Sequence, residues 1–298
     1  MKKFNMQEHF TQRARVLCLM TLMVLVTACS SIRFAYNQGD TLAYWWVNAY
    51  LDLDSEQSGA LKQDINKLFD WHRKTQLKDY VQLLGNAQRQ LAGGQTSPAD
   101  LKANYKDVKA RTELLANKAL PDLAELAMTM KPEQFGRMEK KFNSNNDTFR
   151  KKFIKVDVEK KQKLRYKKSM EQFDLWFGGF SSEQEAVLRK ASDARPLNNE
   201  FWLEERILRQ KKILAALRKI HAEKLSKEAT TAVLADVVKD IFHREEAPEH
   251  RAFYDANLDG NLNLVSTAIR IATPAQKAHA QKRMADWAND FKDLAVSK

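Results

Sequence analysis

The sequence predicts an all-α fold of long antiparallel helices, in one elongated bundle or two adjoining bundles. Apolar residues recur at spacings of three and four, as in Leu61, Ile65 and Leu68, which places them on one helix face. The 298 residues contain 6 prolines and 9 glycines, and alternating β-branched runs, which are typical of strands, are few. Amphipathic helices are therefore the expected elements.

The predicted helices follow from this periodicity and from the residues that start and stop helices. We expect the helix over 54–91 to break near residue 75. We expect the helix over 97–129 to bend at Pro121, because proline removes a backbone donor. Gly178 and Gly179 form the expected turn between an N-terminal bundle, 40–178, and a C-terminal bundle, 179–298. The predicted ranges are 40–51, 54–91, 97–129, 132–177, 181–193, 196–224, 226–245, 248–270 and 274–295.

Residues 1–28 have the features of an export signal. A basic head precedes the apolar run from Val16 to Thr27, which is too short to span a hydrocarbon core of about 30 Å. Small residues then precede Cys29, and the whole resembles a bacterial lipobox. The resemblance implies cleavage before Cys29, acylation of that cysteine and a short tether at 29–39; a plain secretory signal is the alternative. Ser30, where aspartate would resemble an inner-membrane retention signal, favours the periplasmic face of the outer membrane.

The chain that remains after such cleavage is basic and contains no cysteine except Cys29. Residues 1–28 carry four of the 50 basic and one of the 38 acidic residues, which leaves 270 residues with a net charge of +9. Without a disulfide, a hydrophobic core must stabilise the fold, and 270 residues suffice for one. Apart from the covalent lipid on Cys29, no cofactor is expected.

Four helix starts share one plan. An apolar residue and a cap are followed by a glutamine three residues past the cap, which accepts a hydrogen bond from the cap's backbone N–H. Helical proteins often reuse such capping boxes, but these windows also resemble the LTxxQ motif of the periplasmic Spy and CpxP chaperones. That resemblance implies a chaperone-like role. The four residues are Gln57, Gln134, Gln184 and Gln276.

A second resemblance rests on an ordered series of short segments. The series resembles a Gram-negative lipoprotein family known only as a domain of unknown function, although Lys78 stands where proline is expected. The resemblance implies an anchored, all-helical periplasmic protein and brings no activity or catalytic residue. The segments are Arg33 to Asn37, Asp40 to Leu42, Trp45-Trp46, Tyr50 to Leu53, Gln57, Trp71-His72-Arg73 and Gln76 to Tyr80.

Most of the positive charge lies in residues 131–178, which hold fourteen basic and seven acidic residues. Lys160 and Lys163 interrupt the apolar stripe there, so we expect the middle of this long helix to project as a solvated hairpin. It is either a solvated face or a binding surface for anionic lipid headgroups, lipopolysaccharide phosphates or acidic envelope proteins. The export signal makes nucleic acid a poor partner. The candidate binding residues are Arg150, Lys151, Lys152, Lys155, Lys160, Lys161, Lys163, Arg165, Lys167 and Lys168.

Aromatic residues gather just after Cys29. Phe34, Tyr36, Tyr44, Trp45 and Trp46 suit either the membrane headgroup region or the protein core. The helical spacing of Trp45 and Trp46 with their apolar neighbours favours the core.

Two segments have spacings that suggest metal ligands. Asp255, Asn257 and Asp259 match the first ligand positions of a calcium-binding loop, but Ser266 stands where a bidentate glutamate is required. A polar connection between helices, with Gly260 as C-cap, is the favoured interpretation. Residues 243–250 contain two histidines and three glutamates without a zinc spacing, so we expect a solvated helix end. No metal site is predicted, and His72 is expected to be packed and hydrogen-bonded.

The sequence contains no Gly-x-Ser-x-Gly, no phosphate loop and no catalytic cysteine. The function that fits best is therefore a non-catalytic outer-membrane lipoprotein that binds periplasmic or outer-membrane proteins or anionic components. The alternatives are a structural tether or assembly scaffold, linking the outer membrane to peptidoglycan or to a membrane complex, and an envelope-directed hydrolase.

Overall fold

The computed structural model describes residues 31–94 and 96–297, and within these ranges the regular structure is helical, with no strand. The all-α prediction is confirmed. The helices are α2 (Ser31–Asn37), α3 (Gly39–Leu51), α4 (Ser55–Trp71), α5 (Leu77–Ala92), α6 (Pro98–Met128), α7 (Pro132–Phe149), α8 (Val158–Phe177), α9 (Ser182–Asp193), α10 (Asn199–Glu223), α11 (Lys227–His243), α12 (Pro248–Ile271) and α13 (Pro274–Val296). Three short turns join some of them: the π-helical η1 (His72–Gln76) and η2 (Arg150–Ile154) and the 3₁₀ turn η3 (Arg244–Glu246).

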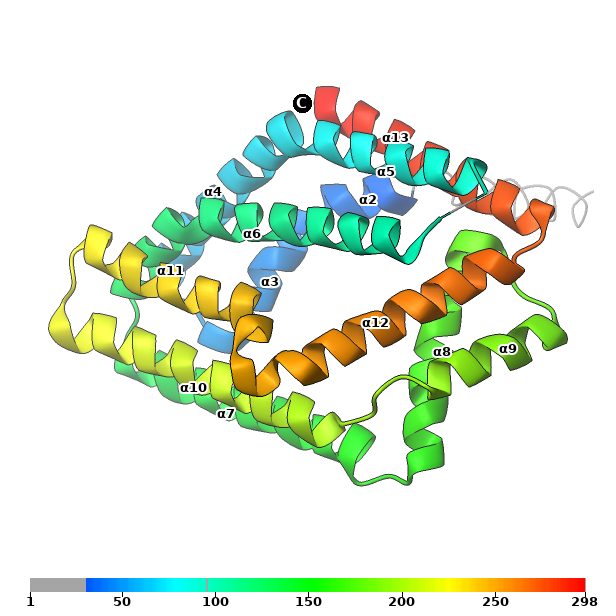
Figure 1. Ribbon diagram of the computed structural model, residues 1–298. Coiled ribbons are helices and arrows are strands. Elements are labelled where there is room, and N and C mark those ends of the chain that lie inside the picture. The colour runs from blue at the N-terminus through cyan, green and yellow to red at the C-terminus, as the bar shows by residue number, and fades with distance from the viewer. Residues whose placement is uncertain (1–30, 95, 298) are drawn as a thin grey trace, which may run out of the picture.

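Helices from opposite ends of the chain lie side by side. α13 runs along α5, and α11 runs along α6 (Figure 1). One hydrophobic core contains Phe173 and Leu264, and the other contains Phe135 and Ile220. Each core therefore takes residues from both sides of Gly178–Gly179, so the predicted division point does not separate the two cores.

The two glycines nevertheless form the predicted turn. Gly178 ends α8 with φ +77°, and Gly179 follows with φ +102°, a backbone region that suits glycine. A Cβ atom on Gly178 would lie 3.2 Å from the His279 ring, so this position also needs a small residue.

The predicted single helix over 132–177 is wrong. α7 continues through the π-helical turn η2, the chain leaves the helix at Lys155, and α8 begins after Asp157. The Asp157 carboxylate accepts a hydrogen bond from the Lys160 backbone N–H at 2.7 Å, so a local N-cap competes with helix continuation. α7 and α8 meet at a corner rather than forming a projecting hairpin (Figure 1).

The segment predicted as a tether is partly helical, because residues 31–37 form α2 and continue almost directly into α3. The prediction that the aromatic cluster here lies in the core is wrong for three side chains. Phe34, Trp45 and Trp46 are 68%, 69% and 66% exposed. The opposite side of α3 enters the core instead, through Leu51.

Near residue 75, where a break is predicted, the helix becomes π-helical for one turn. α4 ends at Trp71, and the π-helical turn η1 separates it from α5. Such turns insert a residue into the helical repeat and shift the side chains that follow. Pro121, where a bend is predicted, lies inside α6.

The four capping glutamines also bind one another in two pairs. The side-chain oxygen of Gln57 accepts from the Asp54 backbone N–H at 3.3 Å, as predicted for a capping box. Its amide group then exchanges hydrogen bonds with Gln134, at 2.8 and 3.2 Å. Gln184 and Gln276 form the second pair, at 2.9 and 3.0 Å. Each pair therefore ties together the starts of two helices distant in sequence: α4 with α7, and α9 with α13.

Candidate functional site

An apolar cavity of about 420 Å³ lies where the first and last described helices meet. Helices α2, α3, α4, α6 and α13 and the turn η1 contribute its walls. Its size falls in the range of small-ligand pockets, which are mostly apolar with a few polar groups. The lining residues are Ile32, Ala35, Tyr36, Gly39, Leu68, Phe69, His72, Leu115 and Phe291.

Tyr36 and His72 form the polar pair of this cavity. The Tyr36 hydroxyl and His72 Nδ1 lie 2.8 Å apart, and the π-helical turn η1 begins at His72. Burial raises the pKa of Tyr36 to about 12, although the charge of Arg73 opposes the shift. Burial also lowers the pKa of His72, so both side chains are neutral at pH 7. A neutral, apolar cavity of this kind suits an uncharged, hydrophobic group.

Three of the segments that carried the lipoprotein-family resemblance meet at this cavity. The Arg73 guanidinium lies over the Tyr36 ring, 5.4 Å from its centre, and donates to Asn37 at 3.4 Å. The Tyr80 ring lies 5.5 Å from His72. The segments Arg33–Asn37, Trp71–Arg73 and Gln76–Tyr80 therefore lie together at one site. His72 is packed and hydrogen-bonded as expected.

The ten predicted basic residues divide into two groups. Seven lysines are exposed, and no carboxylate of the described residues forms an ion pair with them: Lys151, Lys152, Lys155, Lys160, Lys163, Lys167 and Lys168. The other three are engaged. Arg150 pairs with Asp147 at 2.8 Å, and Lys161 pairs with Glu200 at 3.2 Å. Arg165 donates to the backbone carbonyl of Pro196 at 2.7 Å and so holds the connection before α10.

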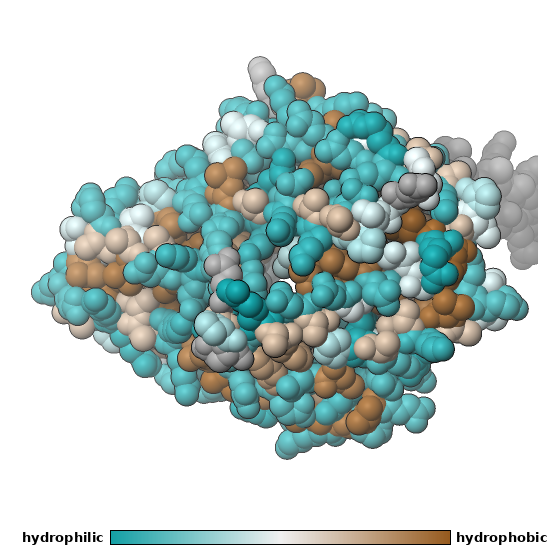
Figure 2. Space-filling view, viewed as in Figure 1, coloured by the Kyte–Doolittle hydropathy of each residue, from teal (hydrophilic) through white to brown (hydrophobic). Residues whose placement is uncertain are grey.

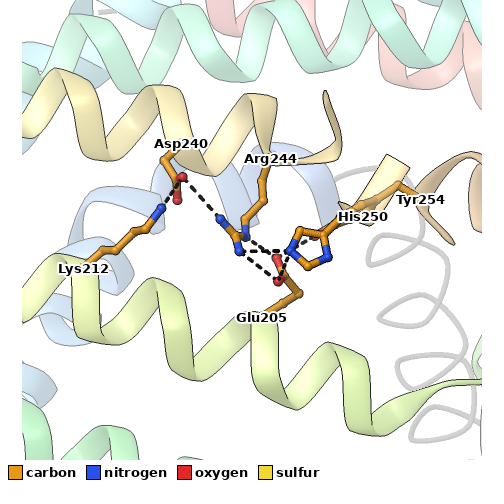
Figure 3. Close-up of polar contacts among 6 residues, drawn as sticks. All are labelled: Glu205, Lys212, Asp240, Arg244, His250 and Tyr254. Carbon is orange, nitrogen blue, oxygen red and sulfur yellow. Dashed lines mark hydrogen bonds and ion pairs between the residues drawn. The ribbon is translucent and has the colours of Figure 1, made fainter. Parts of the chain in front are cut away.

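The prediction of a solvated helix end at residues 243–250 is wrong for Arg244. This residue forms a bidentate ion pair with Glu205, whose side chain is only 3% exposed (Figure 3). The Tyr254 hydroxyl donates to the same carboxylate at 3.2 Å, and His250 Nε2 lies 3.5 Å from it. His243 contacts Glu113 at 2.9 Å, so these residues join α11, η3 and α12 to the neighbouring helices.

Burial alone raises the pKa of the Glu205 carboxyl. The hydrogen bonds and positive charge of Arg244 outweigh this effect, and the net pKa is below its usual value of 4.5. Glu205 is therefore ionised and fully paired, which is the arrangement that a buried carboxylate requires. This geometry is that of a structural ion pair.

The calcium-loop pattern lies inside the continuous helix α12, so both its loop interpretation and the predicted role of Gly260 as a C-cap are wrong. A Cβ atom on Gly260 would lie 3.2 Å from Arg195, so glycine here permits close contact with the α9–α10 connection. Among the described residues, no group of three or more His, Cys, Asp or Glu side chains is placed to hold a metal ion. Cys29 lies outside the residues that the structure describes.

Sequence reasoning did not find Glu205, Leu115 or Phe291. Glu205 lies within an ordinary charged run, and Leu115 and Phe291 lie in helices with regular periodicity. Their place in the site depends on which helices pack together, and no local signal indicates that. Tyr36 and His72 of the cavity, and Arg73 beside it, did carry a signal, because they lie in the ordered segments.

The described residues define an all-α protein with an apolar cavity whose polar pair is Tyr36 and His72. No described helix is long and apolar enough to cross a membrane. The chain belongs to the family of unknown function DUF6279, which it matches over residues 49–231. No curated protein and no solved structure matches the chain.

Proposed function

We propose that this chain is a non-catalytic lipoprotein of the outer membrane that faces the periplasm and binds anionic envelope components. The lipobox-like sequence before Cys29 supports the anchor and the location. Acyl chains would hold the protein at the membrane, and binding would occur on the surface of the helical domain.

The observation that carries the binding proposal is the set of seven exposed lysines without a carboxylate partner on η2, α8 and the turn between them. We call this set the basic corner. Lysines that pair with neighbouring carboxylates contribute little net field, whereas unpaired ones attract anions over about one Debye length. Each is worth on the order of 1 kcal/mol near an anionic membrane surface.

In-cell photo-crosslinking tests this proposal. A photoreactive amino acid is placed at Lys155 or Lys163 in the basic corner and, as a control, at the exposed Lys211 or Lys219 on α10. We expect lipopolysaccharide, phospholipid or acidic-protein adducts from the basic corner and few from α10. Equal adducts from both surfaces would contradict specific binding there.

The identity of the crosslinked molecules distinguishes a tether or scaffold from a chaperone-like role. A few defined proteins would favour a tether or assembly scaffold, and a broad set of unfolded clients would favour a chaperone-like role. For the chaperone, the purified protein should suppress aggregation of an unfolded client at low salt and lose this effect at high salt, because charge attraction is screened.

Mass spectrometry of the purified protein tests the anchor independently. A mature N-terminus at Cys29 with its acyl chains, together with loss of the lipid and of membrane fractionation in Cys29→Ala, would support it. A mature chain that starts elsewhere and carries no lipid would contradict it.

A further inference from the structure

The paired helices α2 and α3 are apolar on two opposite sides. Toward the protein, Ile32 and Gly39 line the cavity and Leu51 is 4% exposed. A surface helix is normally polar on its other side. Here the outer side carries large apolar residues instead. Such a side is expected to contact a second apolar partner outside the chain.

The outer side consists of four residues that we call the aromatic face: Phe34, Leu42, Trp45 and Trp46. Their side chains are 62% to 69% exposed. Leu42, Trp45 and Trp46 are spaced three and four residues apart, so they project from one side of α3, and Phe34 is exposed on the preceding helix α2. Exposed aromatic groups of this size mark interaction surfaces.

Two exposed lysines flank this face. Lys62 Nζ lies 4.6 Å from the centre of the Tyr44 ring, next to Trp45 in the chain. Lys141 Nζ lies 6.0 Å from the Tyr50 ring, which in turn packs on Trp46 at 5.2 Å. Tryptophan beside lysine is typical of the boundary between acyl chains and anionic headgroups.

The position of the face in the chain selects its partner. Phe34 is the fifth residue after Cys29, and five residues span at most about 18 Å. A lipid on Cys29 would therefore hold the face within reach of the headgroups, where any other partner would compete with the bilayer.

We propose that the aromatic face binds the phospholipid surface and lies in its headgroup region, which fixes the orientation of the domain on the membrane. The proposal rests on the lipid anchor of the proposed function. Contact with the headgroup region, rather than insertion across the bilayer, agrees with the short length of α2 and α3.

The test uses the full acylated protein reconstituted in vesicles of phosphatidylethanolamine and phosphatidylglycerol that carry acyl-chain bromine atoms, which quench nearby tryptophans. We expect clear quenching of the wild type, reduced severalfold in Trp45→Phe/Trp46→Phe because these two side chains lie at the interface. The half-buried Trp202 provides the matched control. Trp202→Phe should leave unchanged the amount of tryptophan fluorescence that the bromine atoms remove.

Two further measurements separate the possible outcomes. Mass spectrometry and vesicle flotation report the anchor, so an unlipidated protein that fails to float contradicts the proposed function itself. A lipidated protein that floats but whose Trp45 and Trp46 are not quenched overturns the membrane-contact proposal alone. A dimer in detergent that Trp45→Glu converts to monomer, together with unquenched tryptophans, would instead assign the face to a second copy.

Discussion

Gln57 and Gln134 hold each other through two amide hydrogen bonds, although 77 residues separate them. Each side-chain oxygen also accepts the backbone N–H of its own helix cap. One residue type thus performs two tasks: it completes the helix start and joins that start to another helix. Gln184 and Gln276 repeat the arrangement at the other pair of helices.

We expect Gln57→Ala to lower the free energy of unfolding by about 2 kcal/mol, because it leaves the buried amide of Gln134 without its partner. The exposed Gln63 on the same helix supplies the control, and Gln63→Ala should change stability by less than about 0.5 kcal/mol. Urea unfolding followed by circular dichroism measures both.

A double-mutant cycle tests whether the two glutamines act together. Gln57→Ala/Gln134→Ala should cost clearly less than the sum of the single changes, since the second substitution removes a group that is already unpaired. Strict additivity would show that each glutamine acts only as a cap for its own helix.

Removing the charge of Glu205 should destabilise the junction of α10, η3 and α12. We expect Glu205→Gln to cost roughly 3 kcal/mol, because the largely buried Arg244 then loses its bidentate carboxylate and keeps only the longer contact with Asp240, at 3.4 Å. The exposed pair of Glu139 and Arg218 is the control, and Glu139→Gln should cost less than about 1 kcal/mol.

The same carboxylate predicts a pH effect. The folded-state pKa of Glu205 is below 4.5, so its contribution to stability is present above that pH and is lost as the pH falls toward the folded-state pKa. The midpoint temperature of thermal unfolding should therefore fall more steeply with decreasing pH for the wild type than for Glu205→Gln. Parallel curves for the two proteins would contradict the assigned ion pair.

The lowered pKa of His72 predicts a second effect of pH on stability, in a higher pH range than that of Glu205. Burial lowers its pKa below 6.5, so the unfolded chain binds the proton first, and stability falls as the pH drops below about 6.5. We expect His72→Gln, which keeps a hydrogen-bonding group near Tyr36 but does not titrate, to flatten this part of the stability curve. The slope for one such group cannot exceed about 1.4 kcal/mol per pH unit.

Charge reversal in the basic corner should change binding and leave folding intact. Lys160→Glu/Lys163→Glu removes two exposed lysines that no described carboxylate pairs with, so stability should change by less than about 0.5 kcal/mol. Affinity for vesicles containing phosphatidylglycerol, measured by co-sedimentation, should fall at least tenfold at low salt. An unchanged affinity would show that the basic corner is not the surface that binds these vesicles.

The helices could be predicted from the sequence because their signals are local. A helix start is specified by each capping glutamine, and a helix end by the glycines at 178 and 179. The change of helix type near residue 75 is likewise specified within a few positions. The break at Asp157 was missed because the apolar stripe resumes beyond it and hides the cap.

The cavity and the aromatic face depend on long-range packing. No spacing rule brings Phe291 to Tyr36, since the two lie in helices that meet only in the folded chain. Trp45 has a helical spacing that fits a core, yet α3 turns its other side inward. Periodicity shows that a side chain belongs to an apolar surface, but not whether protein covers that surface.

The contact between the first and last described helices has a consequence for biosynthesis. Arg33 in α2 pairs with Asp290 in α13 at 2.9 Å, and Arg73 beside the cavity donates to Ser297 at 2.8 Å. The ribosome releases α13 after α2 to α12, so the apolar walls of the cavity that those helices supply stay exposed to water until α13 has been made. Closing so long a loop is slow. During synthesis these apolar walls therefore remain open to unwanted contacts until α13 packs against them.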